Sequence, residues 1–143
     1  MSMTYAVTLT PDAELGHVVR CRDIPQVLTW GDTPEAAQEQ AEDAIEVALL
    51  SLMEEGADIP SPTPLQPGEV PVTVPARLAA KVAVYAAWKA AGISKSALAA
   101  RMGRSEGEVR RILDPRHGTK LEQLDEAARA LGGRIVVGFE KAA

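Results

Sequence analysis

The stretch 94–113, SKSALAARMGRSEGEVRRIL, is the part of the chain that most limits its possible folds. Apolar residues recur at helical spacing on both sides of Gly103, which predicts two short helices joined by a tight turn. Ala99 is small enough for close helix packing, and Val109 and Ile112 would hold the second helix down. The spacing is typical of a helix-turn-helix, whose second helix enters the DNA major groove. A pair of packed helices in an ordinary bundle is the alternative.

The remaining side chains of this stretch predict a DNA-facing surface. Ser105 and Glu108 have the spacing of a capping box, which would keep this glutamate at the helix start and away from phosphate. Thr119 and Glu122 repeat the spacing before a predicted helix at 120–131. The residues expected at DNA are Arg104, Ser105, Glu106, Gly107, Arg110, Arg111, Arg116 and Lys120.

Charge is divided unevenly along the chain. Residues 1–74 contain two basic and thirteen acidic residues, a net charge of −11, whereas residues 75–143 contain thirteen basic and seven acidic residues, a net charge of +6. A basic half suits nucleic acid, and an acidic half repels it and suits a basic protein. We therefore expect two domains, 1–74 and 75–143, with different partners, although chance segregation of surface charge would look the same.

The first domain has the pattern β-β-β-α-β. Alternating residues predict strands at 4–10, 17–24 and 26–30, and Thr33 followed by Pro34 predicts the start of a helix that ends at Gly56. A loop with four prolines at 58–69 precedes an edge strand at 70–74. Trp30 and Trp88 are expected in the core. The acidic residues expected at a basic partner are Asp23, Asp32, Glu35, Glu39, Glu42 and Glu46.

The second domain is predicted to be helical up to Gly133, followed by a strand, RIVVGF, at 134–139. The four helices before it offer no strand for it to pair with, and an unpaired apolar strand is a liability in water. We expect it to pair with the same strand of a second chain, so that a dimer presents two reading helices. Pairing with the sheet of the first domain is the alternative. The dimerisation residues would be Ile135, Val136, Val137 and Phe139.

Composition argues against several classes of site. The single cysteine, Cys21, cannot form an internal disulfide, and with only two histidines far apart a zinc site is not expected. A magnesium-dependent nuclease is the enzymatic alternative, with Asp12, Glu14, Asp23 and Asp32 as its carboxylates, but these residues sit in turns, where acidic residues are common. No signal peptide or membrane span is seen. We expect a cytoplasmic protein without catalytic residues, metal or cofactor.

Two stretches resemble a known family. Residues 89–137 resemble the helix-turn-helix domain of HicB-type antitoxins, which is similar to the Cro and repressor class. Residues 23–63 resemble the HicB signature, with an Asp-x-Pro turn, Thr-x-Gly-x-Thr before an acidic helix, and a glycine followed by IPSP. The residues that carry the signature are Asp23, Pro25, Thr29, Gly31, Thr33, Glu35, Ala36, Gly56, Ile59 and Pro60.

The resemblance implies a first domain like a reduced RNase H fold that lacks the nuclease carboxylates. It implies a partner similar to HicA, a small mRNA-cleaving toxin whose catalytic histidine the antitoxin covers, and repression of the shared operon. The family usually has proline and glycine where this chain has Arg22 and Gln26, which affects any partner contact made by that turn. A ligand-sensing transcriptional regulator without a toxin partner is the alternative function.

Overall fold

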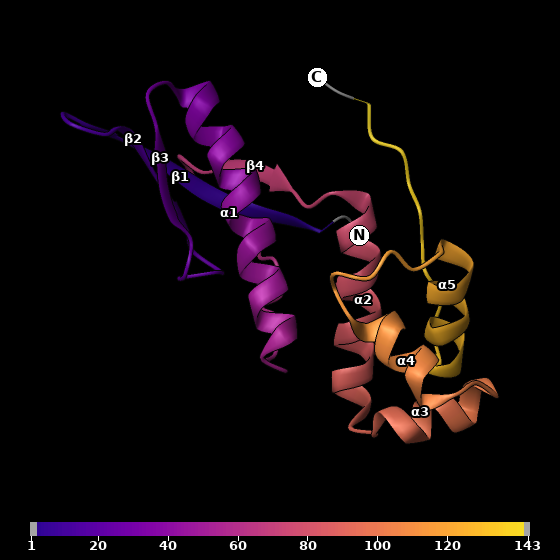
Figure 1. Ribbon diagram of the computed structural model, residues 1–143. Helices are drawn as coiled ribbons and strands as arrows, with labels where there is room; N and C mark the ends of the chain where they lie inside the picture. The colour runs from indigo at the N-terminus through magenta and orange to yellow at the C-terminus, as the bar shows by residue number, and fades with distance from the viewer. Residues whose placement is uncertain (1–2, 142–143) are drawn as a thin grey trace. The chain divides into compact units, whose positions relative to one another are not determined.

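The computed structural model describes residues 3–141, which form two compact units that divide between Pro75 and Ala76 (Figure 1). The first unit combines a sheet with one long helix, and the second is helical. The predicted α+β class is confirmed.

The first unit contains a four-stranded antiparallel sheet in the order β3-β2-β1-β4. Its strands are β1 (Thr4–Asp12), β2 (Gly16–Cys21), β3 (Leu28–Gly31) and β4 (Val70–Thr73). β4 lies at an edge, as the proline within it predicts. β2 ends earlier than expected, at Cys21 in place of residue 24, and β3 begins later, at Leu28 in place of residue 26, because residues 22–27 form a turn. In this turn the Val27 amide donates to the Ile24 carbonyl at 3.0 Å, and both side chains are buried.

The helix α1 (Pro34–Glu54) packs on one face of this sheet. The Thr33 side chain accepts a hydrogen bond from the Ala36 amide at 3.1 Å, and Pro34 occupies the first turn, as predicted. Ile45 and Leu49 are buried, and each such side chain contributes about 1.5–3 kcal/mol through removal from water.

The second unit contains α2 (Ala76–Ala91), α3 (Lys95–Met102), α4 (Glu106–Leu113) and α5 (Leu121–Ala130). Gly92 and Gly103 have φ of 65° and 66°, so the chain turns sharply after α2 and α3 at residues that have no Cβ to clash. The four helices share one apolar core, whose buried members are Val84, Leu98, Ala99, Val109, Ile112, Leu113, Leu124, Ala127 and Ala128.

Two expectations are wrong within the single chain. Lys120, not Thr119, is the N-cap of α5, and no side-chain capping bond is formed there, because the Thr119 hydroxyl is engaged elsewhere. Trp30 is 51% exposed and is not part of the core, since alternation along the edge strand β3 turns it to the surface.

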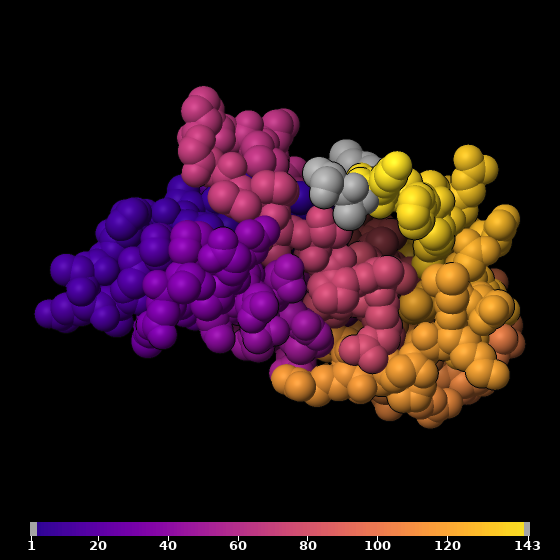
Figure 2. Space-filling model, turned by 90° about the horizontal axis from the view of Figure 1, so that it is seen from above, coloured from indigo at the N-terminus to yellow at the C-terminus, as the bar shows by residue number. Residues whose placement is uncertain are grey.

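Residues 134–139 form no strand in the single chain. The segment continues beyond α5 as an extended trace that runs away from the helices (Figure 1), and it lies open at the outside of the second unit in Figure 2. Only its start is anchored, where the Ile135 amide donates to the Asp125 carboxylate at 3.1 Å. Val136, Val137 and Phe139 are 73%, 77% and 93% exposed. Pairing with a second chain therefore stays a prediction.

Candidate functional site

The turn between α3 and α4 has the geometry that a helix-turn-helix requires. Gly103 adopts the left-handed conformation, and the Arg104 amide returns to the Ala99 carbonyl at 3.0 Å. Ala99 is buried between the helices, while Val109 and Ile112 anchor α4 in the core. One face of α4 is thereby buried and the opposite face is left to solvent.

Both acidic residues at the start of α4 are engaged within the unit. Ser105 and Glu108 form the predicted capping box, with 3.2 Å from the Glu108 amide to the Ser105 hydroxyl. Glu106 accepts from the Ser96 hydroxyl at 2.9 Å and from Arg110 at 2.7 Å. The hydrogen bond from Ser96, followed by that from Arg110, lowers the pKa of Glu106. Both acids are therefore held in their charged, paired form.

The structure separates the predicted DNA-binding residues into two groups. Arg104 forms ion pairs with Glu108, at 2.7 Å, and with Glu126. Its positive charge is therefore neutralised within the unit. Arg110 and Arg111 are exposed on α4, and the pair of Arg110 with Glu106 is a surface ion pair of the kind that contributes little stability. The others lie around α4 and the segment after it: Ser105, Glu106, Arg116 and Lys120 are exposed, and Gly107 is half-buried with room for a Cβ.

Lys81 holds the end of α4 and was not identified from the sequence. This buried side chain donates to the carbonyls of Arg111, Ile112 and Asp114 at 3.0, 3.0 and 2.9 Å, and to the Thr119 hydroxyl at 2.6 Å. The last carbonyls of a helix have no partner within it, so α2 supplies one from outside. Its position in the sequence could have indicated this burial. Lys81 falls on the apolar stripe of α2, three residues after the buried Leu78 and next to the buried Val82.

Lys81 should make the stability of the second unit dependent on pH. Burial lowers the pKa of this lysine to about 8, which the Asp114 carboxylate opposes. Unfolded chains keep the proton up to about pH 10.5, so between pH 8 and 10.5 the unfolded state binds more protons and the free energy of unfolding rises with pH. Thermal unfolding measured from pH 7.5 to 10 should show this rise for the wild type and lose it in Lys81→Met.

The same substitution should destabilise the second unit by about 1–3 kcal/mol at pH 7, because buried carbonyls lose their donor. Arg77→Met removes an exposed cation from the same helix and should leave the free energy of unfolding within about 0.5 kcal/mol. Equal stability of Lys81→Met and Arg77→Met would contradict the assigned role.

Three sets of bonds hold the proline-rich loop of the first unit, and one of them uses a predicted partner-binding residue. Asp23 accepts from the Thr63 amide at 2.8 Å and from its hydroxyl at 2.9 Å, while Arg22 pairs with Glu69 at 2.9 Å. The Tyr5 hydroxyl donates to the Pro60 carbonyl at 2.6 Å. Asp23 and Arg22 thus stabilise the loop.

The other predicted partner-binding residues lie together. Glu35, Glu39, Glu42 and Glu46 recur every three or four positions along α1, and helical spacing therefore puts them in one stripe. We call these four residues the acidic stripe. Asp32 is exposed in the turn before the helix. The stripe gives the first unit a continuous negative surface.

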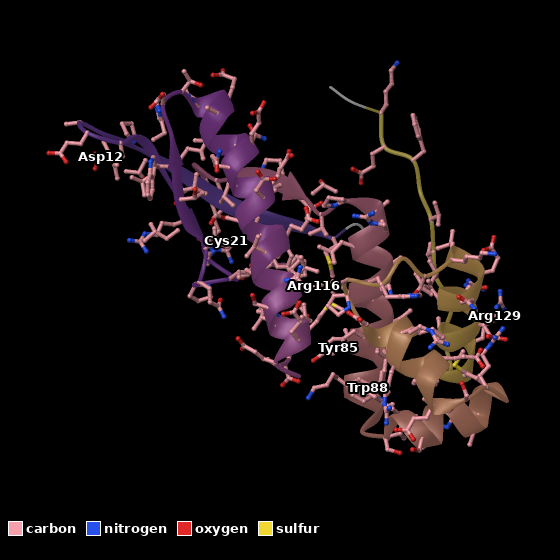
Figure 3. All side chains as sticks on the ribbon, in the orientation of Figure 1. Asp12, Cys21, Tyr85, Trp88, Arg116 and Arg129 are labelled. Atoms are coloured by element: carbon pink, nitrogen blue, oxygen red, sulfur yellow. The ribbon has the colours of Figure 1, made fainter. Side chains whose placement is uncertain are left out.

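The carboxylates considered for a nuclease, Asp12 and Asp23, are bound to different segments of the first unit. Asp12 lies at the tip of the β1–β2 hairpin, away from Cys21 (Figure 3), where it accepts from the Glu14 and Leu15 amides at 2.8 and 3.0 Å. Asp23 is bound to the loop, as above. Over residues 3–141 no three His, Cys, Asp or Glu side chains are grouped as metal ligands would be. Within the same range no helix is both long and apolar enough to cross a membrane.

The sequence is similar to known antitoxins over almost its whole length. A family model described as HicB_like antitoxin of bacterial toxin-antitoxin system matches residues 4–83. The chain is 40% identical over 139 residues to Antitoxin HicB 1 of Photorhabdus laumondii, covering 97% of this chain and 88% of the relative. It is 38% identical over 133 residues to Antitoxin HicB of Escherichia coli K12 (93% and 96%). It is 34% identical over 143 residues to Antitoxin HicB of Pseudomonas fluorescens (99% and 98%).

Proposed function

Because the chain belongs to the HicB-like family of bacterial antitoxins, we propose that it inhibits a small, basic, mRNA-cleaving toxin of the HicA type and represses the operon that encodes both proteins. The observation that carries this proposal is the combination, in one chain, of an acidic α+β unit with a helix-turn-helix unit of opposite charge. Inhibition and repression need no catalysis by this chain, and we place both in the cytoplasm, where mRNA and operator DNA are found.

The first unit is assigned to the toxin. A protein that handles RNA carries positive charge, and the net charge of −11 over residues 1–74 attracts such a partner. The acidic stripe and Asp32 are the groups available for this attraction, since Asp23 is bound within the unit.

The test is inhibition of the small basic protein encoded beside the gene for this chain. The purified full chain should form a complex with that protein and stop its cleavage of mRNA at equimolar concentration. Cleavage that continues at the same rate in the presence of excess full chain would overturn the proposal.

The second unit is assigned to operator DNA. The exposed face of α4 would enter the major groove, with Arg110 and Arg111 carrying most of the affinity and Arg116 and Lys120 near phosphate. Arg104 would act mainly by fixing α4 through its two ion pairs. Residues 134–139 would join two chains, so that two reading helices meet two half-sites.

Replacing Arg110 and Arg111 with alanine should weaken operator binding steeply without affecting toxin inhibition. Each lost phosphate contact lowers the slope of log affinity against log salt by about 0.9, and each lost base contact costs about 1–3 kcal/mol. Arg77→Ala with Arg129→Ala removes the same charge from α2 and α5 and serves as the control. A gel-shift titration at several salt concentrations that gives equal affinities for both double variants would refute the assignment.

A further inference from the structure

The two edges of the sheet in the first unit differ in how well they resist pairing. β4 contains an exposed proline, Pro71, which lacks the N–H that a neighbouring strand needs. β3, at the other edge, has the sequence LTWG, with no proline and no charge. Its exposed side chains are Leu28 and Trp30, at 52% and 51%. β3 is therefore the unprotected edge, to which an extended segment of another protein can add.

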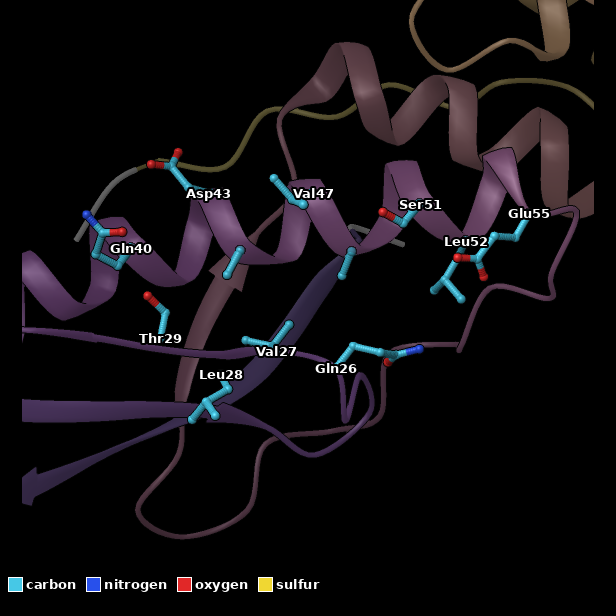
Figure 4. Close-up of a pocket in the computed structure, with 12 residues that line it drawn as sticks. Gln26, Val27, Leu28, Thr29, Gln40, Asp43, Val47, Ser51, Leu52 and Glu55 are labelled. Atoms are coloured by element: carbon cyan, nitrogen blue, oxygen red, sulfur yellow. The ribbon is translucent and has the colours of Figure 1, made fainter.

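A groove of about 550 Å³ runs between β3 and α1 beside this edge (Figure 4). Thr29 of β3 and Val47 of α1 line it, and Val47 is 61% exposed. Asp43 and Glu55 also line it, twelve residues apart, which corresponds to about 18 Å along the helix. The groove thus has an exposed apolar residue between two carboxylates.

The two faces of β3 offer different contacts to an added segment. Gly31 lies against the start of α1, so alternation turns Trp30 to the opposite face of the sheet. A segment that pairs with β3 would bring one set of its side chains to Trp30 and the other set to the groove. One partner segment can then contact the apolar residues Trp30 and Val47 and both carboxylates, Asp43 and Glu55.

We propose that β3 and this groove are the docking edge for the basic toxin, which adds an extended segment to β3. Its apolar side chains pack on Trp30 and Val47, and its basic side chains reach Asp43 and Glu55. This inference rests on the proposed function and names the contact surface that performs it.

Charge selects a basic protein over a second copy of this chain as the occupant. Two copies joined at β3 would bring together two surfaces that each carry −11 over residues 1–74, and like charges at an interface are unfavourable. A basic partner gains from the same charges.

The acidic stripe has a different role in this arrangement. At 3.6 residues per turn the centre of the stripe lies about 110° around α1 from Val47, on the flank of the helix away from the groove, and Asp43 lies between the two. The stripe therefore attracts the toxin at a distance and sets the association rate, whereas the docking edge sets the dissociation rate.

The first experiment measures binding of the neighbouring gene's basic protein to full-length variants. Trp30→Ser with Val47→Ser should raise the Kd at least about tenfold, mostly through faster dissociation. Leu15→Ser with Leu65→Ser replaces exposed apolar residues, 37% and 47% exposed, outside the docking edge and should change the Kd less than about twofold.

The second experiment reverses charge at matched positions. Asp43→Lys with Glu55→Lys should raise the dissociation rate, whereas Glu39→Lys with Glu42→Lys should lower the association rate and its dependence on salt. Hydrogen exchange of the wild type gives a measurement that needs no variant. Adding the toxin should slow amide exchange at residues 26–31 and leave residues 70–73 unchanged.

The outcomes separate the two proposals. If the wild-type chain does not bind the basic protein, the proposed function fails. If the wild type binds but the Trp30/Val47 and Asp43/Glu55 double variants keep its Kd and dissociation rate, the docking edge is wrong and the proposed function stands. The same holds if the wild type binds but amide exchange at 26–31 does not slow.

Discussion

Replacement of Gly31 by alanine should unfold the first unit. A Cβ at this position would lie 2.3 Å from the Ala37 nitrogen, and 2.6 and 2.7 Å from the Ala36 carbonyl carbon and the Ala37 Cα. These are backbone atoms in the first turn of α1, so no side chain can move aside. The helix would have to separate from β3, at a cost of at least about 3 kcal/mol, a large share of the stability of a small domain.

Calorimetry of the full-length variant should show the loss or a large downward shift of one transition, with the other retained. Gly118→Ala is the control, because a Cβ there would meet nothing within 4 Å and its φ is not positive. Gly68→Ala, at φ +85° in open space, should cost about 1 kcal/mol through left-handed strain alone. The Gly31 variant should also lose toxin inhibition and keep operator binding. If Gly31→Ala melts like the wild type, the backbone of α1 can move away from a Cβ at position 31 at little cost, and the prediction is wrong.

Removal of residues 134–143 should convert a dimer into a monomer that binds its operator at least about a hundredfold more weakly. Two linked reading helices bind as one unit, and the advantage of that linkage is about 10²–10⁴ in affinity. The segment is suited to joining chains because Val136, Val137 and Phe139 are exposed and residues 76–141, the described part of the second unit, include no strand to pair with it.

Light scattering and a gel-shift titration test this prediction. Val137→Ser with Phe139→Ser keeps the chain length and should reproduce the loss of the dimer without disturbing the anchor at Ile135. Circular dichroism checks that α2–α5 remain folded. A truncated protein that stays folded and fully dimeric would rule out pairing through this segment.

The sequence by itself determined the features that depend on neighbours along the chain. The caps of α1 and α4 and the left-handed turn at Gly103 follow from residues within a few positions of one another. The periodicity of the chain predicted the strands and the helix of the first unit. Each of these properties is local or additive, so no knowledge of distant contacts was needed.

Other features depended on a distant residue that supplied the deciding contact. The prediction that Thr119 caps α5 is wrong, because Lys81, 38 residues earlier, bonds to its hydroxyl. Asp23 accepts from Thr63, 40 residues later, a contact that the sequence pattern did not indicate, and its role at a partner stays a prediction. A pattern shows that a side chain is polar and where it sits on its element, but not which group it meets.

Only the tertiary structure decided which surfaces are left open. Trp30 reads as a core residue in the sequence, yet it is exposed because the sheet orders its strands β3-β2-β1-β4 and leaves β3 at an edge. Gly31 reads as one of several turn glycines, yet here the backbone of α1 occupies the space of a side chain. Strand order and helix approach arise from packing the whole unit at once, because each apolar face is buried only when a distant element covers it.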